Sequence, residues 1–123
     1  MNQIFDINAL KENLEFDDQE IFMSLYSDFV DEIYSFKDYV GEVKFPMSPE
    51  EKNFLRRELH RMKSSSKAVG AMQLGTSLDS LEKNSEKIDD ILIKENLAEI
   101  TALLEKTKKM VLDRMANLVG NIG

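Results

Sequence analysis

The chain contains no cysteine, no tryptophan and a single histidine among its 123 residues. Without cysteine it forms no disulfide bond and offers no thiolate, and one histidine argues strongly against a histidine-based zinc site. Only two prolines and five glycines are present, which disfavours a loop-rich or all-β fold. No apolar run approaches the roughly 20 residues that cross a bilayer, and the first residues lack the features of a signal peptide. We expect a helical, cytoplasmic protein with no membrane partner.

The length and net charge narrow the class further. A chain of 123 residues accommodates one compact domain but not a catalytic kinase module with a second domain. We therefore expect residues 1–123 to form a single, free-standing domain, monomeric by default. A net charge of -7 argues against nucleic-acid binding, because phosphate backbones are bound by an excess of Lys and Arg.

The basic residues are not spread evenly. Five of the 16 lie between Arg56 and Lys67, a stretch with one acidic residue, Glu58. The sequence therefore predicts one basic stripe on an acidic body.

Apolar residues recur at spacings of three and four over most of the chain, the pattern of amphipathic helices. It predicts a short first helix over 6–14 and four longer helices over 18–40, 49–69, 71–86 and 94–119. The place of residues 87–93 stays open. We expect an all-α fold: an antiparallel up-down-up-down four-helix bundle with a short extra N-terminal helix.

Two helix boundaries carry specific signals. Ser48, Pro49 and Glu51 predict the start of the third helix, because Ser caps, Pro is tolerated in the first turn and the Glu completes a capping box. Gly70 either ends this helix in a left-handed turn or lets two helices approach closely.

His60 lies on the third helix, whose apolar stripe faces the bundle. At about 100° per residue, His60 falls roughly 140° from the centre of that stripe. The stripe consists of Leu55, Leu59, Met62 and Val69, with Ser66 in phase. The sequence therefore predicts that the imidazole points to solvent.

The neighbours of His60 fit phosphate chemistry. Residues three and four positions away share its helix face: Arg56, Arg57, Lys63 and Ser64, with Lys67 one turn further. The cations are expected to favour a neutral imidazole, which has a free nitrogen to attack phosphorus, and Lys63 and Ser64 could donate hydrogen bonds to the phosphoryl oxygens. The alternatives without a functional role are that His60 is a solvated surface histidine, that the basic face is incidental, and that the serines are tolerated by packing.

One segment of the chain resembles the signature of histidine-containing phosphotransfer (HPt) domains. It is the run His60-x-x-Lys63-Ser64-Ser65-Ser66-x-x-Val69-Gly70-Ala71-x-x-Leu74, followed by Leu78, Leu81 and Glu82. Weaker similarity covers most of the chain, including Phe5-Asp6-Ile7 and Phe22. The resemblance implies a four-helix bundle whose exposed histidine accepts a phosphoryl group from a receiver-domain aspartate and passes it to another receiver.

Carried over by position, the resemblance makes His60 the phosphorylated residue and places Lys63 near the phosphoryl group. Gly70 matches a glycine that keeps the neighbourhood of the imidazole open for a docking receiver, and Ser64 stands where a glycine is common. Some relatives place a polar or basic side chain from the next helix near the phosphoryl group. Here Glu82 and Glu86 lie in that stretch, which puts this contribution in question.

The partners that the resemblance implies are response-regulator receiver domains and a hybrid sensor histidine kinase. The basic stripe of Arg56, Arg57 and Lys67 would contact the acidic pocket of a receiver. We expect no cofactor or metal on this chain, since Mg²⁺ belongs to the receiver, and no enzymatic turnover of its own. The alternatives are an adaptor of the same fold that docks without passing phosphate, and a structural bundle.

Overall fold

The computed structural model describes residues 19–122, and these form four helices. They are α2 (Gln19–Glu42), α3 (Pro49–Ala68), α4 (Met72–Asn84) and α5 (Asp90–Ile122). The expected helix over 6–14 lies outside the described residues. No helix in the described part is both long and apolar enough to span a bilayer.

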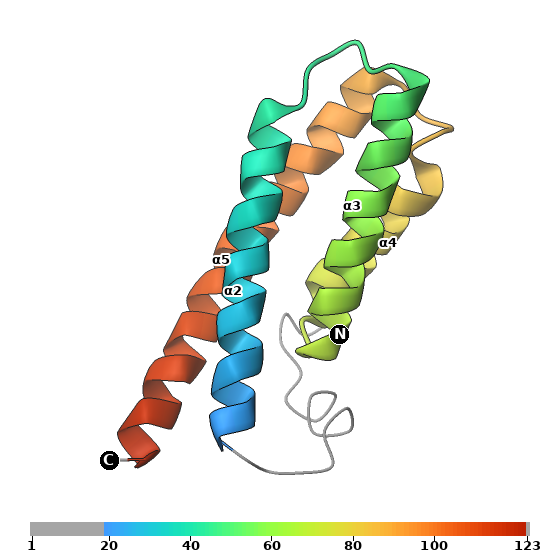
Figure 1. Ribbon diagram of the computed structural model, residues 1–123. Coiled ribbons are helices and arrows are strands. Elements are labelled where there is room, and N and C mark those ends of the chain that lie inside the picture. Colours follow the sequence, from blue (N-terminus) through green and yellow to red (C-terminus); the bar gives the residue numbers. More distant parts are fainter. Residues whose placement is uncertain (1–18, 123) are drawn as a thin grey trace.

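The four helices run up, down, up and down in an antiparallel bundle (Figure 1). Helix α2 packs against α3 and α5, and α4 packs against α3 and α5, with the most extensive contact between α3 and α4. The beginning of α2 and the end of α5 lie side by side at one end of the bundle (Figure 1). The predicted all-α four-helix architecture is therefore confirmed.

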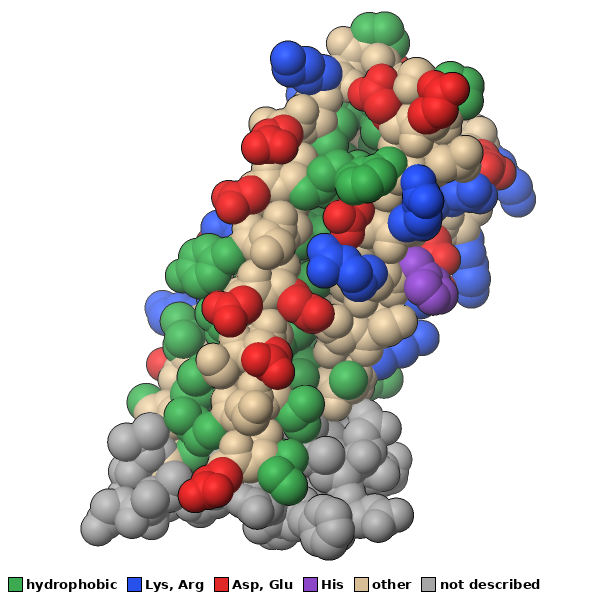
Figure 2. Space-filling model, in the orientation of Figure 1, with side chains coloured by type: hydrophobic (Ala, Val, Ile, Leu, Met, Phe, Trp, Pro, Cys, Tyr) green, Lys and Arg blue, Asp and Glu red, His purple; other side chains and the backbone are tan. Residues whose placement is uncertain are grey.

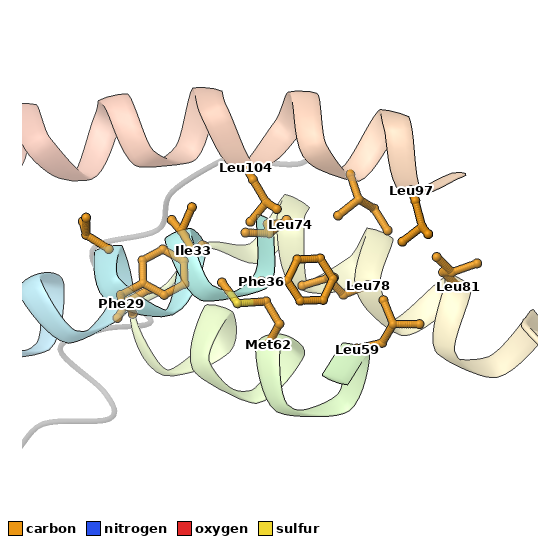
Figure 3. Close-up of a cluster of buried hydrophobic side chains, with 14 of the residues drawn as sticks. Phe29, Ile33, Phe36, Leu59, Met62, Leu74, Leu78, Leu81, Leu97 and Leu104 are labelled. Carbon is orange, nitrogen blue, oxygen red and sulfur yellow. The ribbon is translucent and has the colours of Figure 1, made fainter. Parts of the chain in front are cut away.

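One apolar core joins all four helices (Figure 3). It forms because the predicted stripes at spacings of three and four turn inward together. Burial of these side chains is the main favourable contribution to folding, at roughly 25 cal/mol per Å² of apolar surface. The buried residues labelled in Figure 3 are Phe29, Ile33 and Phe36 of α2, Leu59 and Met62 of α3, Leu74, Leu78 and Leu81 of α4, and Leu97 and Leu104 of α5.

Both ends of α3 follow the sequence signals. Ser48 Oγ accepts a hydrogen bond from the Glu51 amide and Glu51 Oε1 accepts one from the Ser48 amide, each at 3.2 Å. At the other end Gly70 has φ 81°, and the Gly70 and Ala71 amides bond back to the carbonyls of Lys67 and Ser66. This is the left-handed C-terminal turn that glycine permits.

The last helix begins earlier than predicted, at Asp90 and not at residue 94. Asp89 caps it, since its carboxylate accepts a hydrogen bond from the Leu92 amide at 2.9 Å. Ile93 is fully buried, four residues before the core residue Leu97. Residues 91–93 are all apolar, so the sequence did not show which of them faces the core. Residues 87–93 were therefore left unassigned.

Candidate functional site

His60 lies near the middle of α3 and points out of the bundle. Its side chain is 62% exposed, whereas the neighbouring Leu59 and Met62 are buried in the core. The predicted orientation of the imidazole is therefore confirmed. Figure 2 shows the histidine in purple on the surface, with Lys and Arg side chains nearby.

The group that contacts the ring is a carboxylate. Glu82 Oε2 on α4 lies 3.0 Å from His60 Nδ1. An ionised carboxylate only accepts hydrogen bonds, so the contact requires a proton on Nδ1 and, in the neutral ring, leaves the lone pair on Nε2. Glu82, whose place in the sequence put a polar or basic contribution from the next helix in question, thus contacts the ring directly and selects its tautomer.

Lys63 is not the solvent-facing side chain that a one-turn spacing from His60 suggested. Its side chain is 14% exposed, and its Nζ lies 2.9 Å from Glu82 Oε1 and 3.1 Å from Asp79 Oδ1. The side chain lies across the α3–α4 seam, with its ammonium between two carboxylates. Lys63 therefore positions the Glu82 carboxylate, which in turn contacts His60.

The pKa values follow from these contacts. Partial burial opposes ionisation of Glu82, but hydrogen bonds from Lys63 and His60 outweigh it, so the net pKa of Glu82 is lowered. Hydrogen bonds from Lys83 and Lys63 lower the pKa of Asp79. Hydrogen bonds to Glu82 and Asp79 raise the pKa of Lys63. The three groups stabilise one another's charged forms near neutral pH.

These pairs belong to a regular ladder between antiparallel segments. Successive members on α3 are four, three and four residues apart, and their partners on α4 and its following turn run backward at the same spacing. Arg56 faces Glu86 at 2.7 Å, His60 faces Glu82, Lys63 faces Asp79, and the Cβ of a side chain at Gly75 would lie 3.3 Å from Lys67 Cγ. We call these four pairs the α3–α4 ladder.

Beside the ladder lies an open hollow of about 770 Å³. Two of its arginines are already paired, Arg56 with Glu86 at 2.7 Å and Arg61 with Glu58 at 2.9 Å. The predicted residues Arg56, Arg57, His60 and Ser64 thus meet at one site. The full lining is Asn53, Arg56, Arg57, His60, Arg61, Ser64, Ser65, Glu82 and Lys83.

Three predicted site residues do not line this hollow: Lys63, which lies across the α3–α4 seam, Gly70 and Lys67. Gly70 is buried in the turn after α3, ten residues from His60 and so about 15 Å along the helix axis. The expectation that it keeps space open beside the imidazole is wrong in position, because its left-handed backbone shapes the turn instead. Lys67 is exposed at the Gly75 end of the ladder.

Comparison with known protein families decides the class. A family model described as the Hpt domain matches residues 7–110. The chain belongs to the Hpt domain family. This confirms the resemblance that the run from His60 to Glu82 indicated, and it gives the chain a general role in histidine phosphotransfer. The comparisons with curated proteins and with solved structures gave no match.

The sequence did not identify Glu82 and Asp79 as partners of this Hpt site. A signal was present, since Glu82 follows Leu74 and Leu78 at the same four-residue spacing and so continues an apolar stripe. A carboxylate at the edge of a core needs a partner. In the described part of the chain, no group of three or more acidic or histidine side chains is arranged to hold a metal ion.

Proposed function

We propose that this Hpt domain is a phosphocarrier in which His60 accepts a phosphoryl group from the aspartyl phosphate of one receiver domain and passes it to another. One observation carries the proposal. The imidazole is exposed while its Nδ1 contacts Glu82, which leaves Nε2 as the nucleophile on the open side.

The transfer step needs no proton movement on this chain. The Nε2 lone pair attacks phosphorus, the N–P bond forms, and the bond between phosphorus and the aspartate oxygen breaks with its electrons leaving on the carboxylate. The ring then has the phosphoryl group on Nε2 and a proton on Nδ1, so it becomes positively charged. Glu82 stabilises that charge directly. The same contact makes the reverse attack by a second receiver easy, because a cationic ring leaves as neutral imidazole.

Lys63 and Ser64 are proposed to assist in different ways. An ammonium has three N–H donors; that of Lys63 donates to Asp79 Oδ1 and forms an ion pair with Glu82 Oε1. A remaining donor would serve a phosphoryl oxygen, and the Lys63 side chain also positions Glu82. The Ser64 hydroxyl lines the hollow and would donate a further hydrogen bond to the phosphoryl group.

The partners are proposed from the chemistry of the step. A phosphorylated receiver supplies the divalent metal, Mg²⁺, that neutralises the transferring group, so this chain needs no cofactor. The basic side chains Arg56 and Arg57 would attract the acidic pocket of the receiver. Upstream, a hybrid sensor histidine kinase would phosphorylate the first receiver.

A comparison of the wild type with His60→Gln tests the proposal. Receiver domains from the same genome are phosphorylated with acetyl phosphate in Mg²⁺ and incubated with each protein. We expect acid-labile, alkali-stable phosphate on the wild type and none on His60→Gln. Receiver binding without transfer to the wild type would instead indicate a docking adaptor, and equal labelling of the two proteins would remove His60 from the mechanism.

A further inference from the structure

A pair of aromatic rings, tilted at 54° to each other, lies on the surface between α2 and α3, toward the loop that joins them. The Phe54 ring is 5.3 Å from the Tyr39 ring, centroid to centroid, and the Arg57 guanidinium lies 5.8 Å from the Phe54 centroid. Phe54 is 47% exposed, so an apolar ring is open to solvent beside a cation. We call these three residues the aromatic platform. Figure 2 shows a hydrophobic area at this place between α2 and α3.

The platform borders a second hollow, of about 280 Å³. Its floor is apolar, with Val43 and the buried Met47 beside the two rings, and its rim has the acidic residues Glu42 and Glu51. A hollow of this size accommodates one or two apolar side chains. Along α3 the surface thus passes from basic around His60, through apolar at the platform, to acidic at the rim.

The platform is close enough to His60 to share a partner with it. Phe54 precedes His60 by six residues, which places it about 9 Å along the axis of α3 and about 120° around it from His60. A stable protein interface covers about 800 Å² on each partner, which corresponds to a disc roughly 30 Å across. Phe54 therefore lies toward the edge of a footprint centred on His60, on the side where Arg57 lies between the two.

Arg57 connects the two hollows. It lines the His60 hollow and also lies over the Phe54 ring. The other cations around His60 are paired with acids, Arg56 with Glu86 and Arg61 with Glu58, whereas no acidic partner for Arg57 is recorded among the described residues. Its guanidinium is positioned by the ring and is open to an acidic group from outside.

We propose that the aromatic platform is the part of this surface that selects and orients the receiver: Arg57 meets an acid at the rim of the phosphorylated pocket while an apolar receiver side chain enters the hollow beside Phe54. This inference rests on the proposed function, because it takes the receiver to be centred on His60. The acidic side chain of Glu42 at the rim would also orient the receiver. It repels an acidic receiver surface at that place and favours a basic or neutral one.

The chain offers a matched control for the test. Tyr34 on α2 is 50% exposed and lies under the Lys108 ammonium of α5 at 4.8 Å, so it is also an exposed ring beneath a cation. It faces α5 and not α3. Truncating Tyr34 removes a similar amount of exposed apolar surface at a place that the proposed footprint does not include.

The experiment compares wild type, Phe54→Ser and Tyr34→Ser. For each protein, titration calorimetry gives the Kd for a receiver domain that transfers phosphate to the wild type, and single-turnover assays separate the maximal transfer rate from its half-saturating receiver concentration. We expect Phe54→Ser to raise the Kd and the half-saturating concentration about tenfold, as for a buried interface anchor. Tyr34→Ser should leave both within about twofold.

The outcomes separate this inference from the function on which it rests. An unchanged Kd for Phe54→Ser, with circular dichroism showing an intact bundle, overturns the platform proposal even if His60 is phosphorylated. If no receiver transfers phosphate to the wild type, the Kd is measured instead with a receiver that binds the wild-type protein without transferring phosphate. A tenfold loss for Phe54→Ser then supports the platform while the phosphocarrier proposal fails. Equal losses for Phe54→Ser and Tyr34→Ser would indicate a general effect of truncation and also overturn it.

Discussion

Glu82 Oε2 lies 3.0 Å from His60 Nδ1, although 22 residues separate the two in the sequence. The contact fixes which ring nitrogen carries the proton, and Lys63 fixes the contact by binding the other oxygen of the same carboxylate at 2.9 Å. The reactivity of the imidazole therefore depends on a side chain from a different helix.

Replacing Glu82 with Ala should slow phosphoryl transfer to His60. Without an acceptor at Nδ1 the ring proton is shared between both nitrogens, and the positive charge formed on attack loses its partner. A hydrogen bond to a charged group is worth about 1.5 to 3 kcal/mol, so the rate should fall about tenfold to a hundredfold. The measurement is single-turnover transfer, with ¹⁵N NMR of the His60 ring to follow the tautomer.

Glu86→Ala is the control for that substitution. Glu86 is the next acidic member of the ladder and pairs with Arg56, but no contact with the ring is recorded for it among the described residues. A rate for Glu82→Ala equal to that of Glu86→Ala would show that tautomer control does not matter.

Replacing Lys63 with Met should reduce stability in a pH-dependent way. The pKa values of Glu82 and Asp79 lie below their ordinary 4.5 and 3.8, so their contribution is complete above pH 4.5 and is lost as the pH falls through the lowered values. The pKa of Lys63 lies above its ordinary 10.5, so its contribution is complete below pH 10.5 and is lost as the pH rises further.

The difference in Tm between wild type and Lys63→Met should therefore be largest between about pH 5 and 10 and shrink on either side. Lys44→Met provides the comparison, because Lys44 is exposed in the loop before α3. A difference in Tm for Lys63→Met that is constant from pH 3 to 11 would contradict the role of the Lys63–Glu82–Asp79 contacts.

Replacing Gly70 with Ala should destabilise the fold, whereas the same change at Gly41 should not. Gly70 has φ 81°, and an L-residue with a Cβ costs about 1 to 2 kcal/mol in that region. Gly41 lies within α2, where an added Cβ meets nothing within 4 Å, so Ala there should add up to about 1 kcal/mol of stability. For a domain of this size, Gly70→Ala should lower the Tm by about 4 to 8 °C. Thermal melts that rank the two variants in the opposite order would contradict the turn geometry.

Tyr39 should titrate late. Burial of its phenol, followed by the negative charges of Glu58 and Glu51, raises the pKa of Tyr39 to about 12. We expect the pH titration curve of absorbance at 295 nm for Tyr39→Phe to lack one transition near pH 12. The rest of the curve should match that of the wild type. A transition lost near pH 10 instead would mean that Tyr39 is open to solvent and that the platform is not packed as described.

Much of the fold followed from local signals. The capping box at Ser48 and Glu51 and the turn at Gly70 depend on a few adjacent residues, so the sequence alone was sufficient to predict them. The start of α5 was missed because Ile91, Leu92 and Ile93 are all apolar. In such a run, periodicity does not show which residue faces the core.

The site was only partly predictable, for a different reason. Periodicity gives the direction of a side chain relative to its own helix, which was sufficient to expose His60. It does not give the rotation of α4 against α3, and that rotation brings Glu82 to the ring and draws Lys63 across the seam. The two carboxylates that bind Lys63 therefore became visible only in three dimensions.

The number of residues on each side of the turn between α3 and α4 sets the positions of His60 and Glu82 relative to each other. His60 stands ten residues before Gly70 and Glu82 twelve residues after it, so the two arms of the hairpin reach the same height, about 15 and 18 Å from the bend. One inserted residue in an arm would rotate everything beyond it by about 100° and swing the carboxylate off the imidazole without unfolding either helix. The number of residues between these two side chains is thus as much a part of the chemistry as their identities.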